Sequence, residues 1–261
     1  DQLDLVLQAA LLAIAIYHHH HYILSGPVVS ICVAGLVMRG WRRNGFPWLG
    51  ITALLAVILW RDRPFVDNHQ YLLAYAALMI GLVLLVGEAE RMAVLRRCAA
   101  LLLGSVMLLA TVQKLTSADY RSGAFFEYML LAGESRFESA SWLAGGVPIE
   151  DLRSNQDVHA QVLKGDLDAG VLVTGPRIPA MVAGLTALTV LLEGGLALAF
   201  LLPDGRRRHR IRSFLLLLFI TGTYAIAPVV GFGWVLIALG LATAREEERV
   251  FPALLLLLFI T

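Results

Sequence analysis

Long apolar runs, separated by short polar turns, dominate the hydrophobicity pattern of this chain. A helix that crosses the hydrocarbon core of a bilayer needs about 20 predominantly apolar residues, and several runs approach that length. The runs comprise residues 3–17, 22–38, 47–60, 71–86, 98–110, 178–202, 214–244 and those from 252 onward. The run 214–244 is too long for one upright span and contains Pro228, so it predicts two helices that meet near this proline. The pattern as a whole predicts an all-α, polytopic transmembrane helical bundle of about eight or nine membrane segments.

The one long segment outside the apolar runs lies between residues 116 and 176. Its first part, 124–131, is apolar and aromatic enough to lie in the membrane interface. Residues 133–175 mix charged and apolar positions, which predicts short helices rather than a further span. We therefore expect one membrane domain over residues 1–261, with 116–176 as a small extramembrane helical cap. The sequence begins at Asp1 without a methionine and stops within an apolar run, so we expect the natural chain to extend beyond both ends.

The composition excludes an ordinary soluble domain. The chain is 58% hydrophobic and 16% charged, with a mean hydropathy of +0.73, whereas soluble domains are about 45–50% apolar and about 25% charged. The net charge of +1 and the lack of a basic tail in the sequence give no indication of nucleic-acid binding. Cys32 and Cys98 both lie in apolar runs, so a disulfide framework is not expected.

Arginine-rich turns define the expected orientation. They occur at residues 39–43, 91–97, 206–212 and 245–249, and alternation of the helices across the membrane brings all four to one side. Short loops rich in Lys and Arg are retained in the cytoplasm, so this side is expected to be cytoplasmic. The opposite, outer side then carries the four histidines at 18–21, the turn 61–70, Lys114, the cap and Pro228. The candidate chemistry of the chain is thus expected to collect at the outer face.

Lys114 and His69 are the first two candidates. Lys114, one of two lysines in the chain, follows an apolar run. It is either a lysine that extends its charge to the interface or a desolvated, neutral amine that can accept a proton. His69 follows Asp67 and Asn68, which are suitable helix N-caps, so it is either part of a capped first turn or a group that exchanges a proton near neutral pH.

Glu193 lies in the middle of the apolar run 178–202, where a carboxylate is energetically costly and indicates a function by default. It is expected to be protonated or paired with an arginine or tyrosine of another helix. The adjacent Gly194 and Gly195 permit close helix packing, which is the alternative role for this site. The histidines at 18–21 point in different directions on a helix, so they predict an interfacial polar cluster rather than a metal site.

Two stretches resemble signature segments of a known family. Residues 68–72, Asn-His-Gln-Tyr-Leu, open a predicted helix, and Lys-Leu at 114–115 ends another. An Asp-aromatic pair, a glycine and a Glu-Tyr pair follow, as Asp119, Tyr120, Gly123, Glu127 and Tyr128. This pattern resembles the membrane domain of the vitamin K-dependent γ-glutamyl carboxylases and of their bacterial relatives, the HTTM-domain proteins. The resemblance covers about residues 40–244 and implies a bacterial inner membrane protein.

The resemblance also implies a chemistry. In the carboxylases, the lysine that matches Lys114 deprotonates vitamin K hydroquinone, which then reacts with molecular oxygen, and the resulting strong base removes a proton from glutamate before carbon dioxide adds. The residues matching His69 and Asn68 help to hold the reacting groups. A quinone or hydroquinone is thus the expected cofactor, and no metal is expected. The family's later helix carries a histidine and an asparagine, and the matching residues 219–228 contain no histidine. Nothing like the soluble substrate domain of the carboxylases lies within these 261 residues.

Two hypotheses therefore stand. The first is an enzyme that binds and oxidises a quinol at the outer face, with Lys114 and His69 as catalytic residues facing one cavity. The second is a non-catalytic scaffold, or a lipid- or quinone-binding subunit, that partners other membrane proteins in the bilayer. The residues expected to bind the substrate are Asn68, Tyr71, Tyr120, Glu127, Tyr128 and Glu193.

Overall fold

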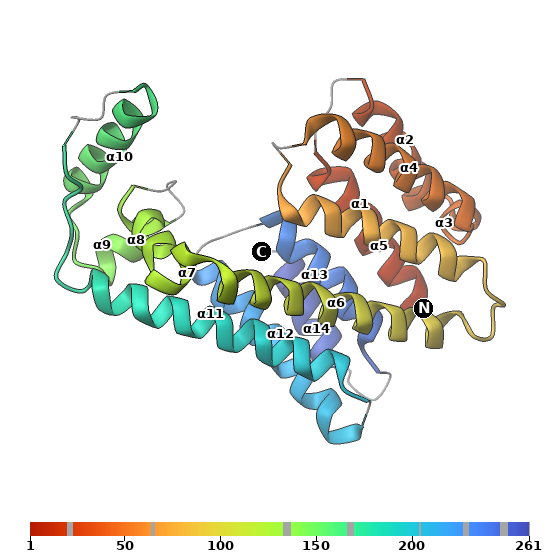
Figure 1. Ribbon diagram of the computed structural model, residues 1–261. Helices are drawn as coiled ribbons and strands as arrows, with labels where there is room; N and C mark the ends of the chain where they lie inside the picture. The colour runs from red at the N-terminus through yellow and green to blue at the C-terminus, as the bar shows by residue number, and fades with distance from the viewer. Residues whose placement is uncertain are drawn as a thin grey trace. The chain divides into compact units, whose positions relative to one another are not determined.

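The computed structural model describes residues 1–19, 23–63, 66–132, 137–165, 170–203, 205–226, 230–245 and 250–260 (Figure 1). Within these ranges every regular element is a helix, and no strand is present. The all-α prediction is therefore confirmed. The helices are α1 (Gln2–Tyr17), α2 (Ser25–Val37), α3 (Arg39–Arg42), α4 (Gly45–Asp62), α5 (Asn68–Leu84), α6 (Arg91–Thr116), α7 (Ala118–Ser122), α8 (Ala124–Leu131), α9 (Glu138–Leu143), α10 (Ile149–Leu163), α11 (Ile178–Leu201), α12 (Arg206–Ile226), α13 (Val230–Thr243) and α14 (Val250–Ile260).

Three of these helices, α4, α6 and α11, are long and apolar enough to cross a membrane. Four shorter apolar helices accompany them in the described residues: α1, α2, α5 and most of α13. These lengths support a multi-pass membrane protein with three candidate spans. The finer prediction of about eight or nine segments also counts the shorter apolar runs. The helices α1, α2 and α5 have 16, 13 and 17 residues, fewer than the about 20 of a typical span, and their count as membrane segments stays a prediction.

Several boundaries differ from the prediction. The basic segments 91–97 and 206–212 were expected to be loops, but they form the first turns of α6 and α12. Arginine is a good helix former, so a basic segment continues readily into the apolar helix that follows it. The run 214–244 does contain two helices, because α12 ends at Ile226 and α13 begins at Val230. The predicted break at Pro228 itself lies outside the described residues.

The chain divides into two compact units, and the division falls within α6, α11 and α12. Unit 1 comprises residues 1–106, 196–221 and 229–261. Unit 2 comprises residues 107–195 and 222–228, and therefore contains the whole of α7, α8, α9 and α10.

Close helix pairs build unit 1. A Cβ on Gly45 of α4 would lie 2.5 Å from the carbonyl oxygen of Gly81 of α5, so glycine is what permits these two backbones to approach. Asn44 caps α4, because its side-chain oxygen accepts a hydrogen bond from the second N–H of the helix. Gln2, at the start of α1, donates to two carbonyl oxygens at the C-terminal end of α13, which aligns these helices in opposite directions.

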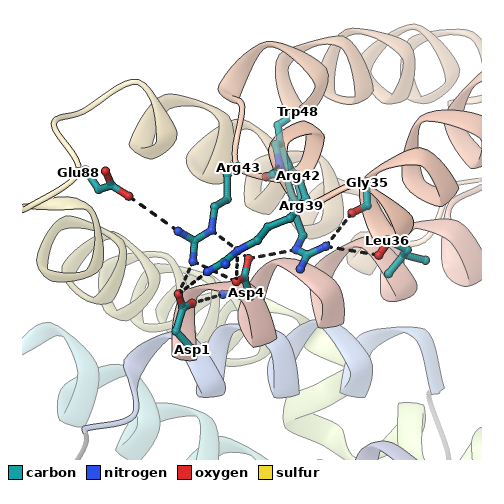
Figure 2. A network of polar contacts seen from close by, with 9 residues as sticks. All are labelled: Asp1, Asp4, Gly35, Leu36, Arg39, Arg42, Arg43, Trp48 and Glu88. Atoms are coloured by element: carbon teal, nitrogen blue, oxygen red, sulfur yellow. Dashed lines mark hydrogen bonds and ion pairs between the residues drawn. The ribbon is translucent and has the colours of Figure 1, made fainter.

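A cluster of charges ties α1 to α3 at one end of unit 1 (Figure 2). The carboxylate of Asp4 is buried and receives Arg39 at 2.9 Å, Arg42 at 3.1 Å and Arg43 at 3.0 Å. Asp1 adds ion pairs with Arg39 and Arg43. The sequence analysis read these arginines only as a topology signal. In the structure they also neutralise an acidic residue that α1 brings to the same end.

Unit 2 has an apolar core of its own, formed by α8, α9, α10 and the start of α11. Its buried members are Leu130, Leu131, Phe137, Val147, Leu152 and Ile178. The buried side chain of Asn155 on α10 donates to the Val173 carbonyl and accepts from the Val173 N–H, at 2.8 and 2.7 Å. This pair of bonds fixes the extended segment before α11. The cap predicted for residues 116–176 is therefore a group of packed short helices in the part of the chain that the structure describes.

Candidate functional site

Lys114 and Glu193 form an ion pair within unit 2. Lys114 lies in the last turn of α6, and Glu193 lies in the second half of α11. The Nζ atom of Lys114 lies 2.9 Å from Oε1 and 2.8 Å from Oε2 of Glu193, so the amine bridges both carboxylate oxygens. The two side chains are only 13% and 8% exposed. The pair is thus almost fully removed from solvent. In such a buried environment, removing either charge leaves the other one unpaired, which lowers the stability of the protein strongly.

Helix packing explains why the two side chains meet. Gly194, next to the acid, packs against Thr111, which lies one turn before Lys114 on α6. A Cβ on Gly194 would sit 3.6 Å from the Thr111 methyl group, so the helices are in ordinary van der Waals contact there. Thr111 itself donates to the Met107 carbonyl and leaves no unsatisfied hydroxyl. This contact lies one turn before Lys114 on α6 and next to Glu193 on α11, so it is at the level of the ion pair.

Aromatic rings cover one side of the ion pair. The Lys114 amine lies 5.2 Å from the centre of the Tyr120 ring, within the range of a cation–π contact. Tyr120 stacks on Phe125, with ring centres 4.3 Å apart, and meets the edge of Phe126. Burial, together with the negative charge of Glu193, raises the pKa of Tyr120 to about 12. Tyr120 is therefore a neutral phenol at physiological pH, able to donate a hydrogen bond but unsuited to act as a base.

This geometry bears on the expected role of Lys114. The prediction required a neutral amine, with nearby carboxylates directed elsewhere. The structure instead directs Glu193 at the amine. The pair thus holds an amine and a carboxylate within hydrogen-bonding distance of each other, and either group can accept a proton when it is in its basic form. The role of Lys114 as a base stays a prediction, with Glu193 as a second candidate.

His69 has a separate environment in unit 1. Its Nε2 atom lies 3.0 Å from the side-chain nitrogen of Gln70, which also donates to the Tyr17 carbonyl at 2.7 Å. A Cβ on Gly231 would lie 3.0 Å from His69 Nε2, so glycine leaves room for the ring beside α13. Asp67 occupies the N-cap position of α5 without a side-chain capping bond, and its carboxylate lies 4.0 Å from the ring. Gln70 and Gly231 were not predicted as neighbours of His69, although Gln70 lies within the 68–72 motif.

The remaining candidates are dispersed. Asn68 and Tyr71 lie exposed in the first turn of α5. The hydroxyl of Tyr128 is hydrogen-bonded to Nε2 of His159 on α10, at 3.0 Å. Glu127 lines an open groove in unit 2 together with Arg121. The structure thus joins Tyr120 and Glu193 to Lys114. Because His69 belongs to unit 1 and Lys114 to unit 2, their shared cavity stays a prediction.

The histidines at 18–21 show no metal-binding arrangement where the structure describes them. His18 is buried and its Nδ1 atom lies 2.9 Å from the Ile14 carbonyl, while His19 lies 3.4 Å from the Asp62 carboxylate. The other two histidines lie outside the described residues. Among the described residues, no three His, Cys, Asp or Glu side chains gather as a metal site would require.

No family model, curated protein or solved structure matches this chain. The resemblance to the carboxylase membrane domain therefore rests on residues 68–72 and 114–128, and membership of that family stays a prediction. What the structure adds is the partner of Lys114. A signal for that pairing was present in the sequence, because an acid within a membrane helix needs a basic partner and Lys114 adjoins an apolar run.

Proposed function

We propose that this chain is a multi-pass membrane protein that binds a quinol beside the Lys114–Glu193 pair and accepts a proton from it. The proposal places the chain in a bacterial inner membrane, with the pair near the outer face and about eight or nine membrane segments. The observation that carries it is the pair itself, buried and backed by the Tyr120 ring. Buried ion pairs beside aromatic surfaces are costly to maintain for structure alone, which favours a chemical role.

The proton passes from the quinol to Glu193 in one step. The O–H bond of the quinol breaks, its proton goes to an Oε atom of Glu193, and the electron pair stays on the quinolate oxygen. The ammonium of Lys114 loses its carboxylate partner in this step and pairs with the quinolate instead. The positive charge is thus already in position where the negative charge develops, as electrostatic stabilisation of a transition state requires. The resemblance supplies molecular oxygen as the oxidant of the quinolate.

The test measures oxygen consumption by the purified protein in lipid nanodiscs with a naphthohydroquinone as the probe. Glu193→Gln should abolish turnover, because an amide cannot accept the proton. The Lys114→Arg variant distinguishes Glu193 from Lys114 as the base. The variant should retain partial activity if residue 114 only supplies a positive charge, and it should lose all activity if the Lys114 amine is the base. Lys164→Met is the matched control, since Lys164 is the other lysine of the chain and is exposed at the end of α10. Wild-type protein without binding or turnover would refute the proposal.

A second candidate is a non-catalytic subunit that uses the ion pair as a structural tie between α6 and α11. It is favoured by the close contact of the two charges, since Lys114 Nζ lies 2.9 Å from Oε1 and 2.8 Å from Oε2 of Glu193. In that case Lys114→Met should reduce the amount of folded protein or of a co-purifying membrane partner. An apolar replacement of both residues should then restore assembly, whereas it cannot restore quinol oxidation.

A further inference from the structure

An open groove of about 710 Å³ runs along α11 in unit 2. One wall consists of α11 residues at helical spacing, among them Val182, Thr186 and Val190, and the other is formed by the junction of α7 and α8. The volume falls in the range of about 300–1,000 Å³ that is typical of small-molecule sites. Since α11 is a candidate membrane span, molecules of the bilayer have direct access to this groove.

A glycine elbow forms the groove. Gly123 joins α7 to α8 with a φ of +82°, in the left-handed region that favours glycine. A Cβ at this position would lie 2.4 Å from the Val182 side chain, so only glycine lets the elbow rest against α11 at this level. The elbow therefore fixes one end of the groove at the height of Val182 and leaves the following turns of α11 uncovered.

The elbow end of the groove carries opposite charges. Arg121 and Glu127 both line it, and Ser122 adds a hydroxyl between them in sequence. A guanidinium binds phosphate through parallel N–H donors, and a carboxylate accepts hydrogen bonds from an ammonium. One cation and one anion at the same end match a zwitterionic head group better than a purely anionic one.

An unsatisfied hydroxyl lies one turn farther along the groove. Thr186 Oγ1 is buried and has no hydrogen-bond partner among the described residues. The hydroxyl of the nearby Thr189, by contrast, is satisfied within the helix, because it donates a hydrogen bond to the Leu185 carbonyl oxygen at 2.7 Å. Four residues of helix separate Val182 from Thr186, a rise of roughly 6 Å. The hydroxyl has almost no exposed surface as it lies, and rotation of the Thr186 side chain toward the groove lets a bound ligand supply the missing acceptor oxygen.

We infer that the groove binds a zwitterionic phospholipid of the phosphatidylethanolamine class. Its phosphate lies at Arg121 and its ammonium at Glu127, both at the elbow. An ester carbonyl oxygen accepts the hydrogen bond of Thr186, and an acyl chain follows the apolar wall toward Val190 and Leu191. The parts of the lipid thus follow one another in the same order as the features of the groove. The head group meets the two charges, the ester meets the hydroxyl, and the acyl chain meets the apolar surface. The site does not depend on the chemistry of Lys114.

The experiment measures bound lipid. Wild-type protein is purified in mild detergent, its lipids are extracted, and phosphatidylethanolamine is quantified per protein by mass spectrometry. Arg121→Gln and Ala183→Trp should each lower retention roughly tenfold or more, the first by removing a charge-assisted bond and the second by filling the groove. Arg153→Gln is the matched control, because Arg153 is an exposed arginine of α10 outside the groove.

A charge reversal tests the head group. Glu127→Lys should shift the preference of delipidated protein from phosphatidylethanolamine to phosphatidylglycerol, as measured by the increase in melting temperature on addition of each lipid. Thr186→Val should weaken retention without changing that preference, and Thr189→Val should leave both unchanged. Monodisperse elution and an unchanged helical circular dichroism signal are required of each variant, and the two threonine variants decide the question if Ala183→Trp does not fold. Retention that is unaffected by Arg121→Gln and Thr186→Val, or an extracted occupant without phosphate, would overturn the inference.

Discussion

Loss of one member of the Lys114–Glu193 pair should destabilise the protein strongly. With Nζ 2.8 Å from Oε2, two unit charges attract by about 6 kcal/mol at an effective dielectric constant of about 20. Desolvation of the two ions offsets much of this attraction. The cost of Lys114→Met is instead governed by the carboxylate that stays buried without its partner. Removing one partner of a buried pair costs about 3–5 kcal/mol.

The prediction is checked by thermal unfolding of the purified protein in one detergent. A cost of that size should lower the melting temperature by about 6–20 °C. Glu193→Leu alone should have a similar effect, because it leaves the ammonium unpaired. The double variant Lys114→Met/Glu193→Leu should recover most of the lost stability, since apolar replacement of a whole buried pair is neutral or stabilising by about 1–4 kcal/mol. Lys164→Met serves as the control and should change stability by no more than about 0.5 kcal/mol.

The double-mutant cycle is what can refute this reasoning. If the Lys114→Met variant has the same melting temperature as the wild type, the Lys114 amine does not neutralise a buried carboxylate. If the double variant is as unstable as the sum of the two single variants, the residues are not coupled. Either result would remove the pair as the basis of the site.

Three further predictions concern the rest of the chain. Asp4→Asn should lower the unfolding free energy by about 3 kcal/mol or more, because three arginines lose their shared carboxylate; chemical denaturation measures this, and an unchanged midpoint contradicts it. Gly45→Ala should lower the free energy of unfolding by about 1–3 kcal/mol, because the added methyl group forces α4 away from α5. Gly50→Ala on the same helix is the control: its methyl group meets open space, so the same assay should show no change or a stabilisation of up to about 1 kcal/mol. In a background without native cysteines, Ser154→Cys should react with a membrane-impermeant maleimide in intact cells and Arg210→Cys only after permeabilisation; the reverse pattern would move the cap to the cytoplasm.

The fold class was accessible from the sequence because it depends on local composition. Apolar runs of helical length can satisfy their backbone only as helices in a bilayer, so the all-α prediction needed no knowledge of neighbours. The division of 214–244 into two helices followed from the length of that run and its proline for the same local reason. Helix starts were less accessible, since an arginine-rich segment such as 206–212 is compatible with either a loop or a first turn.

The candidate site was accessible only in part. Lys114 and Glu193 were selected because a charged group beside or within an apolar run is conspicuous, and Tyr120 was selected through the family resemblance. Their meeting was not predicted, and an arginine or tyrosine was expected as the partner of Glu193. Lys114 and Glu193 are 79 positions apart, and nothing in the local pattern of α6 or α11 determines which faces of these helices meet.

The sequence by itself therefore determined the class of protein: apolar, helical, multi-pass in character, with few charges outside its turns. Tertiary structure alone decided which charges are paired and which surfaces remain open. The structure directs the Lys114 amine of α6 at the Glu193 carboxylate of α11, which lies 79 positions away in the chain. The left-handed Gly123 turns α8 against Val182 and leaves the groove beside Thr186. Both results depend on the approach of segments far apart in the chain, which composition and periodicity do not specify.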